Sequence, residues 1–134
     1  METIHNRGFI HRDIKSDNFL IGAGDKINKL YAIDFGLSKR YVHPHTGEHI
    51  LIKKHKGLIG TARFASINAH LGLEQSRRDD LQALGYLMIY LAKGELPWQK
   101  IKAKTKQQKY KKILDMKDAY TPEALAEGLP GKLA

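Results

Sequence analysis

Four polar side chains near the N-terminus have the types needed to bind metal-associated phosphate and to move a proton. They are Asp13, Lys15, Asn18 and Asp34. Carboxylate and amide oxygens, as in Asp34 and Asn18, are ligands that Mg²⁺ accepts. Asp13 could orient a hydroxyl group and accept its proton, and Lys15 could neutralise charge on a transferred phosphoryl group. Phosphoryl transfer depends mainly on such positioning and charge neutralisation.

These side chains can meet only if the chain leaves the segment around Asp13, reverses direction and returns at Asp34. The intervening residues fit that requirement. Residues 19–21 (Phe-Leu-Ile) and 30–33 (Leu-Tyr-Ala-Ile) are β-prone, and residues 22–25 (Gly-Ala-Gly-Asp) are typical of a turn. The sequence therefore predicts a loop that leads into a β-hairpin, with Asp34 after its second strand.

Two motifs contain these residues. Residues 11–18 read His-Arg-Asp-Ile-Lys-Ser-Asp-Asn, and Asp-Phe-Gly follows, beginning 21 positions after Asp13. This pair resembles the catalytic-loop and metal-binding motifs of protein kinases. The resemblance implies ATP and Mg²⁺ as cofactors, Asp13 and Lys15 as catalytic residues, and Asn18 and Asp34 as metal ligands. It also implies that neighbouring residues support the site, namely His11, Arg12, Phe35 and Gly36.

A third motif narrows the family. Ser-Ile-Asn at residues 66–68 stands where most protein kinases have Ala-Pro-Glu, and Glu-Gln-Ser-Arg-Arg-Asp-Asp-Leu follows at 74–81. Here the chain resembles the casein kinase I family of serine/threonine kinases, and the likeness covers nearly its whole length. The resemblance implies an α+β, protein kinase-like fold: a mostly α-helical C-terminal lobe with a small β-hairpin.

The same resemblance assigns further roles. Thr61 is expected to hydrogen-bond toward Asp13 and Lys15. Asp80 is expected to accept hydrogen bonds from the catalytic-loop backbone, while a simple helix cap remains the alternative. Substrates would be acidic or already phosphorylated proteins, bound at an anion site. The matching residues are Arg63, Lys109 and Lys100, the last at a position where the family usually has glycine.

Residues 1–134 are expected to form a partial kinase domain, because the catalytic motif begins at residue 11. The glycine-rich loop, strand lysine and helix glutamate of a kinase N-terminal lobe cannot be placed in the sequence. One reading is a piece of an active kinase whose missing N-lobe is its partner. The other is a non-catalytic module that binds acidic or phosphorylated peptides. The chain alone is expected to lack kinase activity and to be poorly soluble.

Three helices are predicted after a long irregular loop at 38–59. The first begins near Asp80 and ends at Gly94, with one face formed by Leu81, Leu84, Leu87, Met88 and Leu91. Its opposite face (Tyr86, Ile89, Tyr90) is also largely apolar, so this helix is expected to be buried on most sides. The second covers residues 105–117. The third opens with Thr-Pro-Glu at 121–123, an N-cap followed by proline and an acid, and ends at residues 128–130.

Composition limits the remaining possibilities. The 134 residues contain no cysteine and carry a formal net charge of +9, which favours anionic partners. Residues 100–112 contain seven lysines but no aromatic stacking platform, so nucleic acid is not favoured. No signal peptide or membrane span is visible, and no membrane partner is expected. The expected compartment is the cytoplasm; the nucleus stays open, since Gln107 replaces an arginine common in the family's nuclear-localisation segment.

Overall fold

The computed structural model describes residues 1–55 and 57–130. It contains five α-helices, two 3₁₀ turns and four short strands in this part of the chain. In chain order they are α1 (Glu2–Asn6), β1 (Phe9–Ile10), η1 (Ser16–Asn18), β2 (Phe19–Ile21), η2 (Gly24–Lys26), β3 (Leu30–Ala32), β4 (Lys39–Arg40), α2 (Ile67–His70), α3 (Arg77–Lys93), α4 (Lys106–Ala119) and α5 (Pro122–Ala126).

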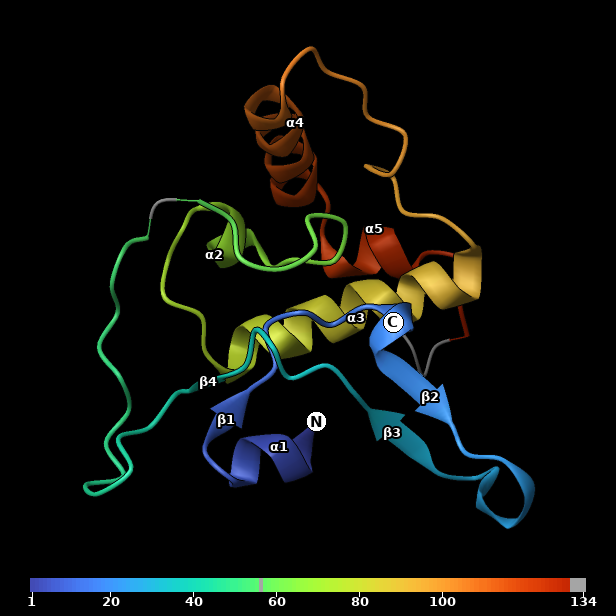
Figure 1. Cartoon of the computed structure of the whole chain (residues 1–134). Helices are drawn as coiled ribbons and strands as arrows, with labels where there is room; N and C mark the ends of the chain where they lie inside the picture. The colour runs from blue at the N-terminus through green and yellow to red at the C-terminus, as the bar shows by residue number, and fades with distance from the viewer. Residues whose placement is uncertain (56, 131–134) are drawn as a thin grey trace.

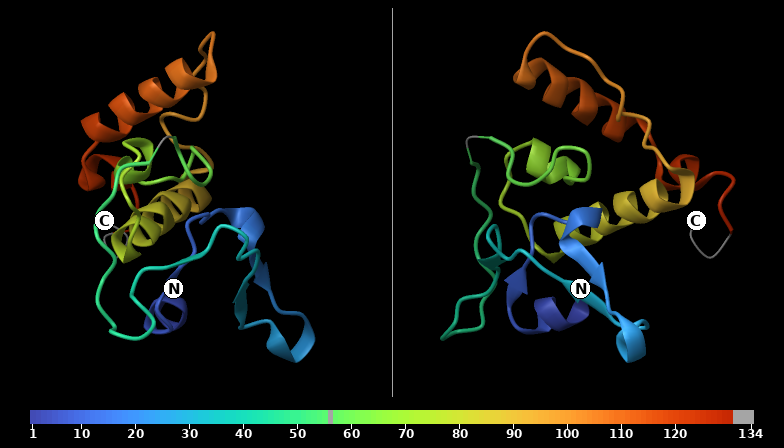
Figure 2. Two further views of the ribbon diagram at one scale, coloured as in Figure 1. Left: turned by 60° about the vertical axis from the view of Figure 1, so that its left-hand side comes forward. Right: turned by 45° about the vertical axis from the view of Figure 1, so that its right-hand side comes forward.

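Helix α3 lies in the middle of the molecule (Figure 1). The strands and α1 lie on one side of it, and α2 and α4 lie on the other, in all three views (Figures 1 and 2). Buried apolar side chains from α3, α4, α5 and the connecting loops form the core; they include Ile14, Phe64, Tyr86, Leu87, Leu96, Trp98, Ile113 and Leu125. Among the described helices, none combines the length and apolar character needed to cross a membrane.

The predicted hairpin is confirmed. Strands β2 and β3 pair antiparallel, with Phe19 opposite Ala32 and Ile21 opposite Leu30. The Ile33 N–H also donates to the carbonyl oxygen of Asn18 at 3.0 Å. The pairing thus continues to the residue before Asp34, which brings the end of the hairpin back to the catalytic loop.

A second small sheet was not predicted. Strands β1 and β4 pair antiparallel, Phe9 with Arg40 and Ile10 with Lys39. Each strand has only two residues, too few to show an alternating pattern in the sequence. Their pairing places the entry to the catalytic loop beside the segment that follows Gly36, so the long loop at 38–59 is regular at its start.

Helix α3 ends where predicted, but it begins three residues before Asp80 and is less buried than expected. It begins at Arg77 and ends before Gly94, which adopts a left-handed conformation with φ 81°. The prediction that the helix is buried on most sides is wrong, because three side chains of its leucine and methionine face are exposed: Leu81, Met88 and Leu91. The buried residues are Asp79, Asp80, Ala83, Tyr86 and Leu87. Polar bonds of the two aspartates, described below, require this rotation of the helix.

Helices α4 and α5 begin as predicted. The hydroxyl groups of Thr105 and Thr121 accept the backbone N–H groups of Gln108 and Ala124, which caps the two helices. Helix α4 continues two residues beyond the predicted end, to Ala119, and α5 ends at Ala126 rather than at residues 128–130. Both differences are within the usual uncertainty of helix ends.

Candidate active site

Asp80 holds the catalytic loop. Its side chain is buried in the first turns of α3, and its two oxygens accept the backbone N–H groups of His11 at 2.8 Å and Arg12 at 2.9 Å. The Nε2 atom of His5 lies 2.9 Å from the same carboxylate. The structure thus shows the backbone contacts expected of Asp80, and an acidic residue near a helix N-terminus is itself favourable.

Two residues of the site have a backbone conformation that is unusual for a side chain with a Cβ atom. Among the described residues other than glycine, only Arg12 (φ 67°) and Asp34 (φ 57°) have a positive φ in the left-handed region. Such backbone is mildly strained and persists where the surrounding structure holds it. Asp80 holds the backbone at Arg12, and the Arg12 Nε–H donates to the carbonyl oxygen of Leu37 at 2.6 Å.

The ring of His11 supports the second of these residues. It is fully buried, its Nε2 atom lies 3.0 Å from the carbonyl oxygen of Ile33, and it packs against the Phe35 ring at 5.2 Å between centroids. These contacts bracket Asp34 on both sides in the chain. Sequence reasoning placed His11 and Phe35 as supporting residues, and here they lie beside the backbone that carries Asp34.

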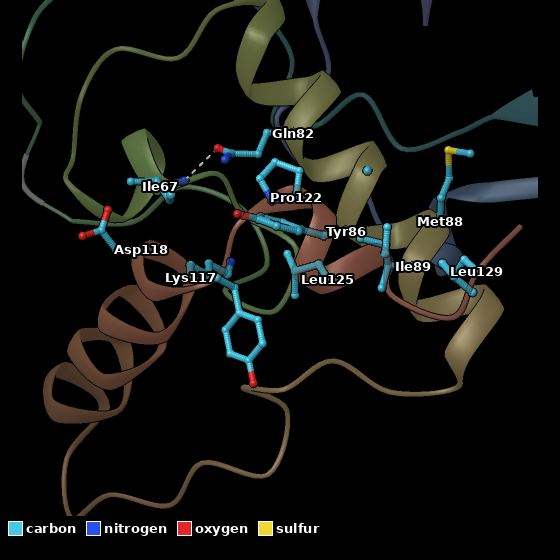
Figure 3. Close-up of a pocket in the computed structure, with 13 residues that line it drawn as sticks. Ile67, Gln82, Tyr86, Met88, Ile89, Lys117, Asp118, Pro122, Leu125 and Leu129 are labelled. Carbon is cyan, nitrogen blue, oxygen red and sulfur yellow. Dashed lines mark hydrogen bonds between the residues drawn. The ribbon is translucent and has the colours of Figure 1, made fainter. Parts of the chain in front are cut away.

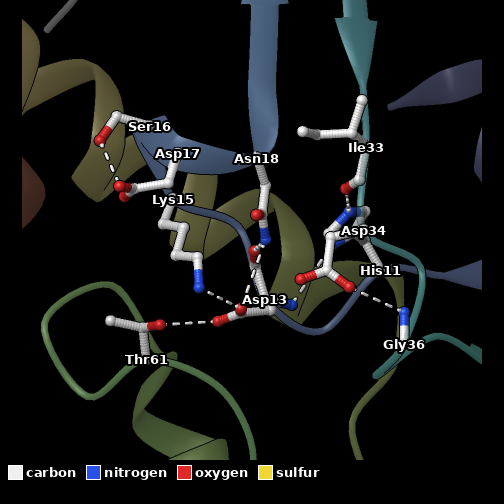
Figure 4. Close-up of polar contacts among 10 residues, drawn as sticks. All are labelled: His11, Asp13, Lys15, Ser16, Asp17, Asn18, Ile33, Asp34, Gly36 and Thr61. Atoms are coloured by element: carbon white, nitrogen blue, oxygen red, sulfur yellow. Dashed lines mark hydrogen bonds and ion pairs between the residues drawn. The ribbon is translucent and has the colours of Figure 1, made fainter.

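The carboxylate of Asp13 lies at the centre of the polar contacts (Figure 4). The Thr61 hydroxyl donates to one oxygen at 2.7 Å, and the Lys15 ammonium contacts the other at 2.8 Å. The Asn18 amide also donates to that second oxygen, at 3.3 Å. Burial raises the pKa of Asp13, but the bonds from Lys15, Thr61 and Asn18 lower it more, so the net pKa is below the ordinary value. Asp13 is therefore ionised at neutral pH.

Lys15 is correspondingly held as an ammonium. Its hydrogen bond with Asp13 raises its pKa, and the negative charges of Asp17 and Asp34 contribute in the same direction. Figure 4 shows the Asp34 side chain beside His11 and Asp13, with Lys15 and Thr61 on the other side of Asp13. The hairpin thus places Asp34 next to the catalytic loop that carries Asp13, Lys15 and Asn18.

Asn18 and Asp34 fit the role of magnesium ligands. The Asn18 Nδ2 atom donates to the Asp13 carbonyl oxygen at 2.8 Å, which orients the amide, and no donor to its Oδ1 atom is found in residues 1–55 and 57–130. One Asp34 oxygen accepts the Gly36 N–H at 3.2 Å, and the other has no such internal bond among the described residues. These two atoms are hard oxygen donors, and Mg²⁺ commonly uses one or two protein oxygens together with water and substrate phosphates.

Gly60 allows Thr61 to reach Asp13. Its φ is 98°, and a Cβ atom at this position would lie 2.5 Å from the carbonyl oxygen of Arg12. Only glycine combines this conformation with so close an approach. The segment that carries Thr61 can therefore lie directly against the catalytic loop.

A groove of about 820 Å³ extends from Asn18 and Lys15 past Thr61. Arg63 and Lys109 line it, as expected of an anion site. Lys100 does not belong to the lining residues; its ammonium contacts the carboxylate of Glu95 on the exposed surface. Lys106, which sequence reasoning missed, lines the groove instead. Its spacing of three residues from Lys109 on one helix is the signal that could have identified it.

Glu74 forms a second ionic cluster that the sequence did not reveal. Its buried carboxylate contacts Lys39 at 2.9 Å and His55 at 2.8 Å. Burial raises the pKa of Glu74, but the hydrogen bonds and charges of Lys39 and His55 lower it more, so the net pKa is below its usual value. The cluster connects β4 and the long loop to the segment before α3.

The comparison with known protein families agrees with this geometry. The model of the protein kinase domain matches residues 1–127, nearly the whole chain. Kinase domains in general use ATP and a divalent metal to transfer a phosphoryl group. The hydrogen-bonded aspartate, its neighbouring lysine and the two oxygen ligands on a hairpin are the parts of that reaction which this chain contains. The chain belongs to the protein kinase family.

Proposed function

We propose that this chain forms the catalytic half of a serine/threonine kinase of the casein kinase I type. Its substrates would be acidic or already phosphorylated proteins, and its cofactors ATP and Mg²⁺. The observation that carries the proposal is the Asp13 carboxylate, which is held between the Thr61 hydroxyl at 2.7 Å and the Lys15 ammonium at 2.8 Å. An ionised carboxylate can orient a hydroxyl nucleophile and accept its proton, while the ammonium beside it offsets the charge of the phosphoryl group.

Each residue then has a defined part. Magnesium-bound ATP supplies the phosphoryl group, and the Asn18 and Asp34 oxygens would hold the metal. Asp13 orients the substrate hydroxyl and accepts its proton as the new O–P bond forms and the bond between the γ-phosphorus and the β–γ bridging oxygen breaks, which releases ADP. Lys15 remains an ammonium and offsets the negative charge on the transferred group. Thr61 keeps the Asp13 carboxylate in one orientation and connects it to the segment that lines the peptide groove.

The packing of the family-specific motifs supports the casein kinase I assignment. The Ser66 hydroxyl donates to the Asp79 carboxylate at 2.6 Å and accepts the Ala69 N–H at 3.0 Å. Asp79 in turn accepts the Ser76 N–H at 2.7 Å. The Ser-Ile-Asn motif and the Arg-Arg-Asp-Asp motif are thus bonded to each other, which gives a physical reason for their occurrence together.

The proposed substrate class follows from the charge of the groove. Lys15, Arg63, Lys106 and Lys109 line it, while Asp17 is the acidic residue among its lining side chains. Such a surface attracts carboxylate and phosphate groups. Arginine and lysine side chains at its edge can form charge-assisted hydrogen bonds with them. We expect an acidic or phosphorylated peptide to lie along this groove, with its acceptor hydroxyl at Asp13.

The nucleotide side of the site would be completed by a kinase N-lobe. The hairpin next to Asp34 has large apolar side chains in solvent, among them Leu20, Ile21 and Leu30. Exposed apolar side chains gathered on one element commonly mark a contact surface. We propose that an N-lobe with a glycine-rich loop covers this hairpin, and that the 134-residue chain alone transfers no phosphate.

Phosphate transfer to casein tests the proposal. The chain alone and the chain joined to the N-lobe of a casein kinase I enzyme would be incubated with radiolabelled ATP and Mg²⁺. Label on casein serines from the joined protein only, lost in Asp13→Asn, is the expected result. A folded joined protein that binds ATP but transfers no label would contradict the proposed activity. Capture of a phosphorylated peptide without transfer would favour the non-catalytic peptide-binding module.

A further inference from the structure

Lys117 occupies an unusual place for a lysine. It lies on α4, and only 1% of its side chain is exposed. Its amine donates to the carbonyl oxygens of Ala62 at 2.9 Å and Ala65 at 2.5 Å. It also lies over the rings of Tyr86 at 4.9 Å and Trp98 at 5.1 Å. A lysine is rarely buried to this extent without a carboxylate partner.

The bound carbonyl groups belong to residues 61–65, which we call the peptide-binding segment. Its first residue, Thr61, bonds Asp13, and Arg63 lines the groove. The Trp98 indole N–H donates to the Arg63 carbonyl oxygen at 2.7 Å. The buried side chains of Trp98 and Lys117 thus bind three carbonyl groups of the segment, and Lys117 binds two of them.

We propose that Lys117 is a positioning residue for phosphoryl transfer. Its amine holds the backbone of the peptide-binding segment, so that Thr61 reaches Asp13 and Arg63 faces the substrate. This role in catalysis rests on the kinase function proposed above. The anchoring of the segment itself rests only on the contacts of the amine.

The charged and titratable groups around Lys117 come from several elements. His70 on α2 lies 3.3 Å from the amine, and burial, together with the positive charge of Lys117, lowers the pKa of His70 to about 4. The Tyr86 hydroxyl on α3 remains protonated, since burial raises its pKa to about 12. Lys117 also lines a cavity of about 370 Å³, and Asp118 and Tyr120 are among the other residues that line it (Figure 3). Within residues 1–55 and 57–130, no carboxylate forms an ion pair with Lys117.

The missing ion pair has a measurable consequence. Burial lowers the pKa of Lys117 to about 7. A movement that exposes the amine to water would restore a higher pKa, so the open form binds a proton more readily than the closed form. By linkage, protonation favours opening, and the segment closes more firmly as pH rises above 7. The change is at most about tenfold in the opening equilibrium per pH unit.

Hydrogen exchange on the full chain measures this opening. The N–H groups of Phe64 and Ala65 both donate to the Thr61 carbonyl oxygen at 2.9 Å and report on the segment. After correction for the intrinsic exchange rate, their protection should rise between pH 7 and 9. Trp98, the one tryptophan of the chain, should show a change in fluorescence centred near pH 7 because its ring lies over the amine.

Lys117→Met keeps the apolar stem and removes the amine. It should lower protection at Phe64 and Ala65 by about tenfold, since the Ala65 carbonyl oxygen loses its donor and the Ala62 carbonyl oxygen keeps only the His70 contact, and abolish the pH dependence of both signals. Lys111→Met is the matched control, because Lys111 is on the same helix but exposed; it should change neither. Should Lys117→Met not fold, the pH series on the unmodified chain decides. Constant protection and constant Trp98 emission between pH 6 and 9 would overturn the proposal.

A separate measurement distinguishes the anchoring role from the proposed kinase function. A phosphoserine-containing acidic peptide would be titrated into the chain and its Lys117→Met variant. About tenfold weaker binding to the variant is expected from the displaced Arg63. Equal binding by both proteins would overturn the role in substrate positioning. If neither protein binds the peptide while the exchange signals behave as expected, the substrate class is wrong and the anchor stands.

Discussion

The carboxylate of Asp13 receives donors from both the catalytic loop and a segment 48 positions later in the chain. Lys15 supplies charge, and Thr61 supplies a neutral hydroxyl with a fixed direction. The carboxylate therefore has a defined orientation before any substrate binds. Preorganised groups of this kind favour catalysis because little rearrangement is needed during the reaction.

Replacement of Thr61 by valine should separate the contribution of the Thr61 hydroxyl group from that of the Lys15 charge. The variant keeps the shape of the side chain but loses the 2.7 Å bond to Asp13. The pKa of Asp13 should rise, because a hydrogen bond that lowers it is absent, and unfolding should require about 1 kcal/mol less free energy. Carboxyl ¹³C NMR titration and urea unfolding measure the two effects. Thr61→Ser, which keeps the hydroxyl, should retain most of the wild-type pKa.

Asp80 provides a second test at the scale of one residue. Asp80→Asn removes the charge and turns one acceptor into a donor beside the His11 and Arg12 N–H groups. A loss of about 2–4 kcal/mol in the free energy of unfolding is expected, because buried donors lose their partner. The exposed Asp115 is the control: Asp115→Asn removes only a solvated ion pair and should change stability by less than about 0.5 kcal/mol.

At the scale of elements, the site depends on close contact between separate loops. The segment at Gly60 lies against the catalytic loop, and the Glu74 cluster connects β4 with the long loop and the approach to α3. Neither contact involves a long helix or strand. Such loops keep their shape through specific backbone conformations and buried ion pairs, so single substitutions there should have large effects.

Gly60→Ala should displace the segment that carries Thr61. The new Cβ atom would lie 2.5 Å from the Arg12 carbonyl oxygen, at a φ of 98°. The expected loss is about 2–4 kcal/mol from strain and overlap together, measured by urea unfolding. Gly57 has a similar φ of 109° with nothing within 4 Å of an added Cβ. Gly57→Ala therefore reports the backbone strain alone and should cost less; equal losses would contradict the contact argument.

The Glu74 cluster should make the folded state less stable as the pH falls into the acid range. The folded-state pKa of Glu74 is below its ordinary value. Its contribution is therefore complete above that ordinary value and is lost as pH falls through the folded-state pKa. Glu74→Gln should melt at a lower temperature than the unmodified chain at pH 7, and the difference should shrink toward pH 3. A difference in melting temperature that is independent of pH would show that the charge is not involved.

At the scale of the whole molecule, the apolar surface is uneven. Buried apolar side chains gather between α3, α4 and α5, but the β2–β3 hairpin exposes 72% of Ile21 and 67% of Leu30, which are cross-strand partners. Apolar side chains paired on an exposed hairpin favour association with another surface.

The chain alone should therefore associate with itself at high concentration. Light scattering after size exclusion is expected to give a mass above the 15.2 kDa of one chain. Replacement of Ile21 and Leu30 by serine should restore a monomer, because it removes this apolar pair. Leu51→Ser serves as control, since Leu51 is equally exposed but lies in the long loop. If the double variant still associates, the surface that mediates self-association lies outside this hairpin.

The sequence alone determined the parts that are encoded locally. The two kinase motifs, the hairpin between them and the helix cap at Thr121 all depend on residues within about twenty positions of each other. Turn residues, β-prone runs and capping hydroxyls act over that range, so their patterns can be interpreted directly.

The tertiary structure decided what depends on distant contacts. The orientation of α3 follows from Asp80, which bonds residues 69 and 68 positions away, and the burial of Lys117 follows from carbonyl groups 55 and 52 positions away. Apolar periodicity could not predict either, because it holds no information on polar partners that lie far away in the sequence, and a buried polar group left without a partner is costly. The sequence of a lysine-rich helix does not show which of its lysines faces inward. The contacts of Lys117 with the peptide-binding segment show it only in the folded structure.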